Sequence, residues 1–132
     1  MIVFQVSILV FGFPLVNTLF NNQNFNNINK LHNIEQELNI KSYSFGELAP
    51  ELIWEYDGVI KNIYKNKKLD FPEVDSFGLL VDEDLKIDFQ KYFEKEYNIT
   101  HFTRFDNNYI INKKKEKRSI RLTRDLFILK KK

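Results

Sequence analysis

Cysteine is absent from this chain of 132 residues, which excludes disulfide scaffolds, thiolate metal sites and cysteine nucleophiles. Histidine is also rare. His32 and His101 lie far apart in the sequence, without neighbouring residues in a ligand pattern. The sequence therefore supports neither a metal site nor a Ser/His/Asp arrangement, and we expect both histidines to be surface or strand residues.

Glycine is scarce as well, and the four glycines form no phosphate-binding loop, which excludes the commonest nucleotide-binding motifs. The run Asp82-Glu83-Asp84 resembles the start of a calcium loop, but Ile87 stands where such a loop requires glycine. Helix capping by Asp82 or Asp84 explains these acids better. No catalytic, cofactor-binding or metal-binding residue is assigned, and no cofactor is expected.

Positive charge is missing from the start of the chain, where no lysine or arginine precedes Lys30. Residues 2–20 are apolar with few exceptions, close to the ~20 residues of a membrane-spanning helix. A secretory signal would need a positive n-region and a small-residue cleavage site, and both are absent. We interpret 1–20 as the end of a transmembrane helix, 21–27 as a polar linker and 28–132 as a soluble α/β domain. The alternative for 1–20 is a buried core helix or strand pair.

The neutral flanks of the apolar run favour a domain on the non-cytoplasmic side of the membrane, because cytoplasmic flanks carry an excess of Lys and Arg. We therefore expect a membrane location, with the soluble domain on the extracytoplasmic, periplasmic side.

Periodicity predicts three helices in the soluble part. The first covers 28–38, with Asn27 or Asn29 as its N-cap and Asn39 after its last turn. The second begins at Pro50 and ends at Gly58, which we expect in the left-handed conformation. The third has apolar positions from Leu85 to Tyr97.

Strands are predicted at 40–45, 59–64, 76–81 and 99–105, with a closing hairpin of 109–111 and 120–129. The run 76–81 is continuously apolar and bounded by acids, which is typical of a central strand covered on both faces. The predicted fold class is α/β, a small mixed sheet with helices packed on it, preceded by a hydrophobic transmembrane helix.

Three glutamates spaced by four, Glu47, Glu51 and Glu55, suggest paired carboxylates for acid–base chemistry. Because Glu47 precedes Pro50, a solvated helix face explains them better. Trp54, the only tryptophan, is expected at the edge of the inward face as a packing anchor. Its replacement by alanine would then cost about 3–5 kcal/mol.

Basic residues are concentrated near the C-terminus, where they suit phosphates of lipid headgroups or nucleic acid, or simply the solubility of a hairpin loop. They are Lys113, Lys114, Lys115, Lys117, Arg118, Arg121, Arg124 and Lys130 to Lys132. A formal net charge of +2 is too small to indicate a nucleic-acid-binding protein as a whole, and no nucleic-acid partner is expected.

The order of elements resembles a known family. An apolar segment ending in Pro14-Leu15-Val16-Asn17 is followed by Tyr43-Ser44-Phe45 and by Pro50-Glu51-Leu52-Ile53-Trp54. The strand at 77–81, the helix at 89–97 and the closing strand at 121–129 also fit. Together they resemble the C-terminal extracytoplasmic domain of bacterial polyprenyl-phosphate-dependent glycosyltransferases, the family of aminoarabinose transferases and protein mannosyltransferases.

This resemblance implies a small α/β sandwich on a multi-helix membrane body that takes a sugar from a polyprenyl-phosphate donor and gives it to a lipid or protein acceptor. The family's catalytic carboxylate lies in an early loop without a counterpart here, so no catalytic residue is carried over. The expected function is a non-catalytic extracytoplasmic domain, with the membrane and the donor as partners through the membrane body. The alternative is an accessory subunit of an organellar or ribosomal assembly whose basic tail contacts RNA.

Overall fold

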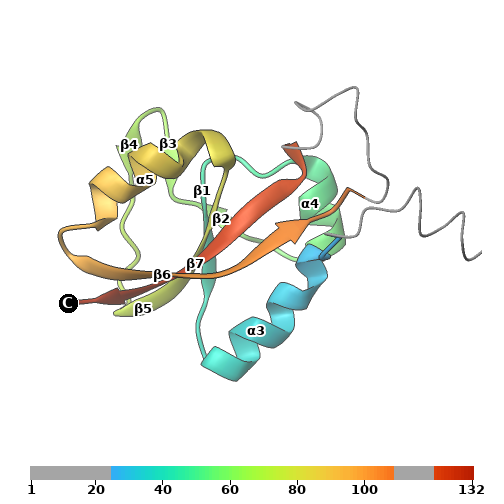
Figure 1. Cartoon of the computed structure of the whole chain (residues 1–132), viewed down its shortest axis with the longest axis horizontal. Helices are drawn as coiled ribbons and strands as arrows, with labels where there is room; N and C mark the ends of the chain where they lie inside the picture. Colours follow the sequence, from blue (N-terminus) through green and yellow to red (C-terminus); the bar gives the residue numbers. More distant parts are fainter. Residues whose placement is uncertain (1–24, 109–120) are drawn as a thin grey trace, which may run out of the picture.

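The computed structural model describes residues 25–108 and 121–132, which form a mixed sheet with helices on both faces (Figure 1). The helices are η2 (Ile28–Lys30), α3 (Leu31–Leu38), α4 (Pro50–Tyr56), η3 (Glu83–Leu85) and α5 (Lys86–Phe93). The strands are β1 (Ser42–Phe45), β2 (Lys61–Asn62), β3 (Tyr64–Lys65), β4 (Lys68–Leu69), β5 (Ser76–Val81), β6 (Tyr97–Asp106) and β7 (Thr123–Lys131). The α/β class and the small mixed sheet predicted from the sequence are confirmed.

Five strands form the main sheet in the order β2-β1-β5-β7-β6. Strands β2, β1 and β5 are parallel, while β7 runs antiparallel to β5 and to β6. Strand β5 is third of five, which confirms the prediction that 76–81 is central. Strands β3 and β4 form a separate small hairpin, whose turn contains Asn66 and Lys67 at φ values of 52° and 60°.

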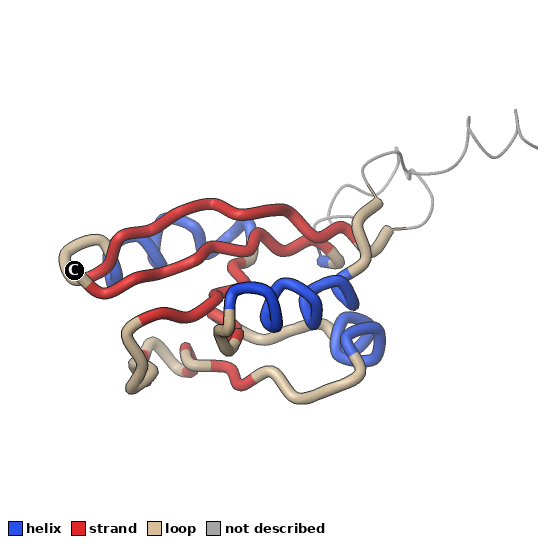
Figure 2. The backbone as a smooth tube through the Cα atoms, turned by 90° about the horizontal axis from the view of Figure 1, so that it is seen from below, coloured by secondary structure: helices blue, strands red, loops and turns tan. Residues whose placement is uncertain are grey.

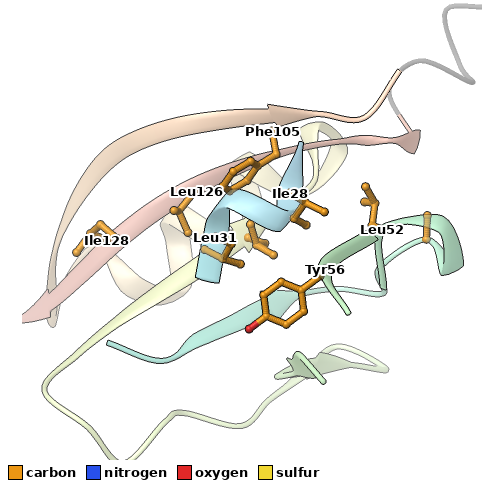
Figure 3. Packing of buried hydrophobic residues seen from close by; sticks show 9 residues of the cluster. Ile28, Leu31, Leu52, Tyr56, Phe105, Leu126 and Ile128 are labelled. Carbon is orange, nitrogen blue, oxygen red and sulfur yellow. The ribbon is translucent and has the colours of Figure 1, made fainter. Parts of the chain in front are cut away.

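Helices lie on either side of the sheet (Figure 2). Because side chains alternate between the two faces, the sheet separates two hydrophobic clusters. Leu80 of β5 and Leu126 of β7 pack against η2, α3 and α4, and Figure 3 shows this cluster. Leu79 of β5 and Leu129 of β7 lie in the cluster on the other face, which includes α5. A strand buried on both faces needs apolar residues at successive positions, which explains the continuous apolar run 76–81.

Helix boundaries follow the predicted signals at several points. The Asn27 side chain accepts a hydrogen bond from the backbone N–H of Asn29 at 3.0 Å and so caps η2. Asn39 follows α3 in the left-handed conformation, with φ 51°, and Pro50 opens α4 as predicted. The sequence predicts these helix ends because each depends on the local preference of the residue that stands there.

Two boundary predictions were wrong. The left-handed residue after α4 is Asp57, with φ 56°, instead of Gly58. Helix α5 ends at Phe93, and Tyr97 opens β6, where its buried ring packs edge-on against Phe77 at 5.6 Å. Tyr97 matches the helical period, but tertiary packing places it in the sheet.

The predicted strand at 59–64 forms only the short strands β2 and β3, and Val59 is exposed. Strand β7 pairs along its length with β5 and β6, whereas the predicted partner segment 109–111 lies outside the described residues. The transmembrane helix predicted at 1–20 also lies outside them. Within the ranges 25–108 and 121–132, no helix is long and apolar enough to cross a membrane.

Candidate functional site

Helix α4 exposes three neighbouring apolar side chains, those of Pro50, Ile53 and Trp54, which we call the Trp54 surface. Trp54 is 83% exposed, which overturns the expectation that Trp54 is a packing anchor. The reason is helical geometry. Leu52 and Tyr56, four residues apart, lie on one face of α4 and are buried, so Trp54 midway between them projects to the opposite side.

Two open hollows lie on either side of the Trp54 ring. One, of about 620 Å³, is lined by Pro50, Ile53, Trp54, Asp57 and Gly58. The other, of about 570 Å³, is lined by Pro50, Glu51, Trp54, Glu55, Asn107 and Leu122. Because both share Pro50 and Trp54, the indole stands as a ridge between two shallow depressions. Such an exposed aromatic group with apolar neighbours is typical of an interaction surface.

The described chain begins, breaks off after Asn108 and resumes at Arg121 in this part of the domain, whereas the C-terminus lies at the opposite end (Figure 1). Asn26 and Asp106 exchange two backbone hydrogen bonds of 2.9 Å, which places the start of the described chain beside the end of β6. The backbone N–H of Asn107 donates to the carbonyl of Leu122 at 3.1 Å, where the described chain resumes. Since Asn107 and Leu122 also line a hollow at Trp54, the surface lies where the chain passes into 1–24 and 109–120.

The glutamates near α4 take part in polar contacts with neighbouring segments. Arg121 holds Glu51 through an ion pair of 2.8 Å, and the Asn27 side chain donates to Glu55 at 3.2 Å. Glu47 precedes the helix, as expected. A backbone hydrogen bond and the contact with Arg121 lower the pKa of Glu51, whereas a general acid needs a raised pKa. The arrangement favours a solvated helix face over acid–base catalysis.

A second polar centre lies on the other side of the sheet, around the buried carboxylate of Asp125 on β7. Lys86 Nζ of α5 contacts its Oδ2 at 2.8 Å, and His101 Nε2 of β6 lies 2.9 Å from its Oδ1. Arg104 approaches Asp125 at 3.8 Å, and Glu83 bridges Lys86 and Arg104 at 3.0 and 3.2 Å. We call these five residues the Asp125 network.

The pKa of Asp125 reflects a balance between burial and its cationic partners. Burial raises this pKa, but the hydrogen bonds from Lys86 and His101 and the charges of Lys86 and Arg104 together lower it below the ordinary value of 3.8. Asp125 is therefore an ionised anchor that ties β7 to β6 and α5. The five side chains pair with one another, as in a structural ion-pair network.

His101 lies at the boundary between the Asp125 network and a hollow of about 510 Å³. The hollow is lined by Gln90, Glu94, Tyr97, Asn98, Ile99, His101, Phe127 and Lys132. The contacts of His101 are the Asp125 carboxylate and the Phe127 ring, 5.2 Å away. Neither partner is a nucleophile, so the pair orients the imidazole without forming a Ser/His/Asp triad.

The sequence prediction placed His101 correctly on a strand but missed its pairing with Asp125. A usable signal was present: Arg124 and Asp125 interrupt an apolar strand, and buried charges require partners. The Arg124 guanidinium is buried and donates to the backbone carbonyls of Arg121, Thr123 and Glu47. Arg121 and Arg124 of the basic C-terminal set thus have structural contacts, while 113–118 lie outside the described residues.

The acids 82–84 do not form a cation site. Asp82 occupies the N-cap position of η3 without a side-chain capping hydrogen bond, and its Oδ2 lies 3.9 Å from Arg124 Nη2. In the part of the chain that the structure describes, no three His, Asp or Glu residues are grouped to hold a metal ion.

Comparisons with known proteins add no identity: no family model, curated protein or solved structure matches this chain.

Proposed function

We propose that this chain is a non-catalytic, membrane-attached α/β domain. The observation that carries the proposal is the position of the Trp54 surface. Helix α4, which carries this surface, packs against η2 at the end of the domain to which the apolar segment 2–20 connects. A domain held by an apolar anchor turns its anchored end toward the membrane, so an exposed apolar surface at that end has a function there.

The site geometry favours attachment over catalysis. The Asp125 network holds a carboxylate whose pKa is lowered, and Glu51 beside Trp54 also has a lowered pKa. Neither environment prepares a carboxyl group to donate a proton near neutral pH. The ion pairs of Asp125 and Glu51 therefore stabilise the fold and do not prepare either carboxylate for acid catalysis.

The narrower assignment is the non-catalytic extracytoplasmic domain of a polyprenyl-phosphate-dependent glycosyltransferase. It rests on the resemblance of 43–54 and 121–129 to that family and on the neutral flanks of 2–20. In that setting the domain would support the membrane body or the access of the acceptor, and sugar transfer would occur elsewhere. An upstream reading frame that encodes several hydrophobic spans would support this assignment, and its absence from the genomic DNA would remove it.

Membrane attachment is tested by fractionation of cells that express the full chain. We expect it in the membrane pellet after washes with high salt and alkaline carbonate, which remove proteins held by charge alone. A variant with Ile8→Lys and Phe11→Lys should move to the soluble fraction with an unchanged circular dichroism spectrum. A wild-type chain released by salt would contradict apolar attachment and would favour the RNA-contacting alternative.

Orientation is tested separately, and the absence of native cysteine makes the test direct. Ile87 is 72% exposed on α5, so Ile87→Cys provides a single thiol on the opposite side of the sheet from α4. Labelling by a membrane-impermeant maleimide in intact spheroplasts is expected for an extracytoplasmic domain. Labelling only after lysis would place the domain in the cytoplasm.

A further inference from the structure

We propose that the Trp54 surface lies in the headgroup region of the lipid bilayer that anchors the chain. This inference rests on the membrane attachment proposed above, and it identifies what the Trp54 surface contacts. The partner is a phospholipid bilayer, contacted by the Trp54 indole and by the neighbouring side chains of Pro50 and Ile53.

The length of the connection limits the distance of this surface from the bilayer. The apolar run ends at Phe20 and the described chain begins at Phe25, five residues later. Even a fully extended chain covers at most about 18 Å over five residues. Phe25 must therefore lie close to the bilayer surface when residues 2–20 are inserted in it.

Helix α4 is tied to this anchored end by short contacts. The Asn27 side chain donates to Glu55 of α4 at 3.2 Å, and Ile28 shares a core cluster with Leu52 and Tyr56 (Figure 3). Two residues separate Phe25 from Ile28, so α4 lies close to the anchor, and its outward face carries the Trp54 surface. A surface this close to the anchor contacts the headgroup region of the bilayer.

The side chains on this surface match the chemistry of that region. Tryptophan is enriched at membrane interfaces, because its ring is apolar and its indole N–H donates hydrogen bonds to headgroups or water. The carboxylate of Glu51 is paired with Arg121, and that of Glu55 accepts a hydrogen bond from Asn27. The Asp57 carboxylate also lines one of the hollows. Because a bilayer without net charge does not repel these carboxylates, phosphatidylcholine is a suitable probe.

The single tryptophan makes the contact measurable in the full chain. The chain is reconstituted into phosphatidylcholine vesicles, and vesicle flotation first establishes attachment. Tryptophan emission is then compared between ordinary vesicles and vesicles with acyl chains brominated near the headgroup. We expect a shift of the emission to shorter wavelength and loss of most of the emission in the brominated vesicles.

Matched variants separate surface contact from attachment. Ile53→Asp places a charge beside the indole and should reduce the quenching by brominated lipid while flotation is retained. Ile87→Asp introduces the same charge at another exposed apolar residue, on α5, and should leave the quenching unchanged. Circular dichroism of each variant checks that the fold is intact.

The results distinguish this inference from the proposed attachment. A chain that floats while Trp54 is quenched by aqueous acrylamide and not by brominated lipid overturns the inference and leaves attachment intact. Protection of Trp54 from both quenchers also overturns it, because protein, such as the chain's own apolar segment, then covers the surface. A chain that does not float refutes the attachment itself.

Discussion

Nε2 of His101 lies 2.9 Å from Oδ1 of Asp125, which joins the two C-terminal strands through side chains where β6 has its irregularity. The register of β6 against β7 shifts between His101 and Thr103. Phe102, between them, is partly exposed. The Asp125 network therefore holds the strands together where the ladder between them is interrupted.

Asp125→Asn is expected to destabilise the domain by about 2 kcal/mol, because it weakens hydrogen bonds between charged groups and leaves Lys86 with Glu83 as its remaining carboxylate partner. The folded-state pKa of Asp125 is lowered, so its contribution is complete above the unfolded-state pKa of about 3.9 and disappears as pH falls through the folded-state pKa. Urea unfolding at neutral and acidic pH should show a difference from wild type that narrows below pH ~4. A difference that does not change with pH would contradict this explanation.

A second polar contact fixes α4 to α3. The buried Tyr56 hydroxyl donates to Oε1 of Glu35 at 2.7 Å, and the Tyr56 ring stacks on His32 at 4.0 Å. Tyr56→Phe keeps the ring and removes the hydrogen bond to a charged acceptor, so we expect a loss of about 1–2 kcal/mol in urea unfolding. Glu35→Gln retains an acceptor oxygen and should cost less.

The contribution of Tyr56 also predicts an alkaline effect. Burial, then the hydrogen bond and the charge of Glu35, raise the pKa of the Tyr56 hydroxyl. Its contribution is therefore present below the unfolded-state pKa of about 10 and is lost as pH rises through the folded-state value. The stability difference between wild type and Tyr56→Phe should narrow above pH ~10. If it grows there instead, Tyr56 ionises more readily in the folded protein than in the unfolded chain.

Gly46 follows β1 with φ 101°, and an added Cβ would lie 2.6 Å from Cδ1 of Leu85. Gly46→Ala combines a left-handed backbone with this clash, so we expect it to cost about 2 kcal/mol or more. Gly58→Ala is the control, because Gly58 is not left-handed and the nearest atom to its new Cβ is in the Tyr56 ring at 3.0 Å. Equal losses in urea unfolding would mean that backbone conformation does not decide the effect at Gly46.

The sequence predicted those parts of the fold that depend on local preference and burial on both faces. Asn27, Asn39 and Pro50 mark helix ends through their own backbone chemistry, and the apolar run of β5 requires cover on both sides. The Asp125 network was missed because His101 and Asp125 are 24 residues apart and meet only through strand pairing. Trp54 was misplaced because a helix of seven residues is too short for its inward face to be fixed by periodicity.

Neighbouring positions on α4 provide a direct test of the corrected inward face. Leu52 is fully buried beside Tyr56, whereas Trp54 is 83% exposed. Leu52→Ala should cost about 2–5 kcal/mol in urea unfolding, and Trp54→Ala should stay within about 0.5 kcal/mol of wild type. A loss this small for Trp54→Ala would contradict the loss of about 3–5 kcal/mol expected if Trp54 were a packing anchor. A large loss for Trp54→Ala together with a small one for Leu52→Ala would mean that α4 presents its other face to the sheet, and the Trp54 surface would not exist.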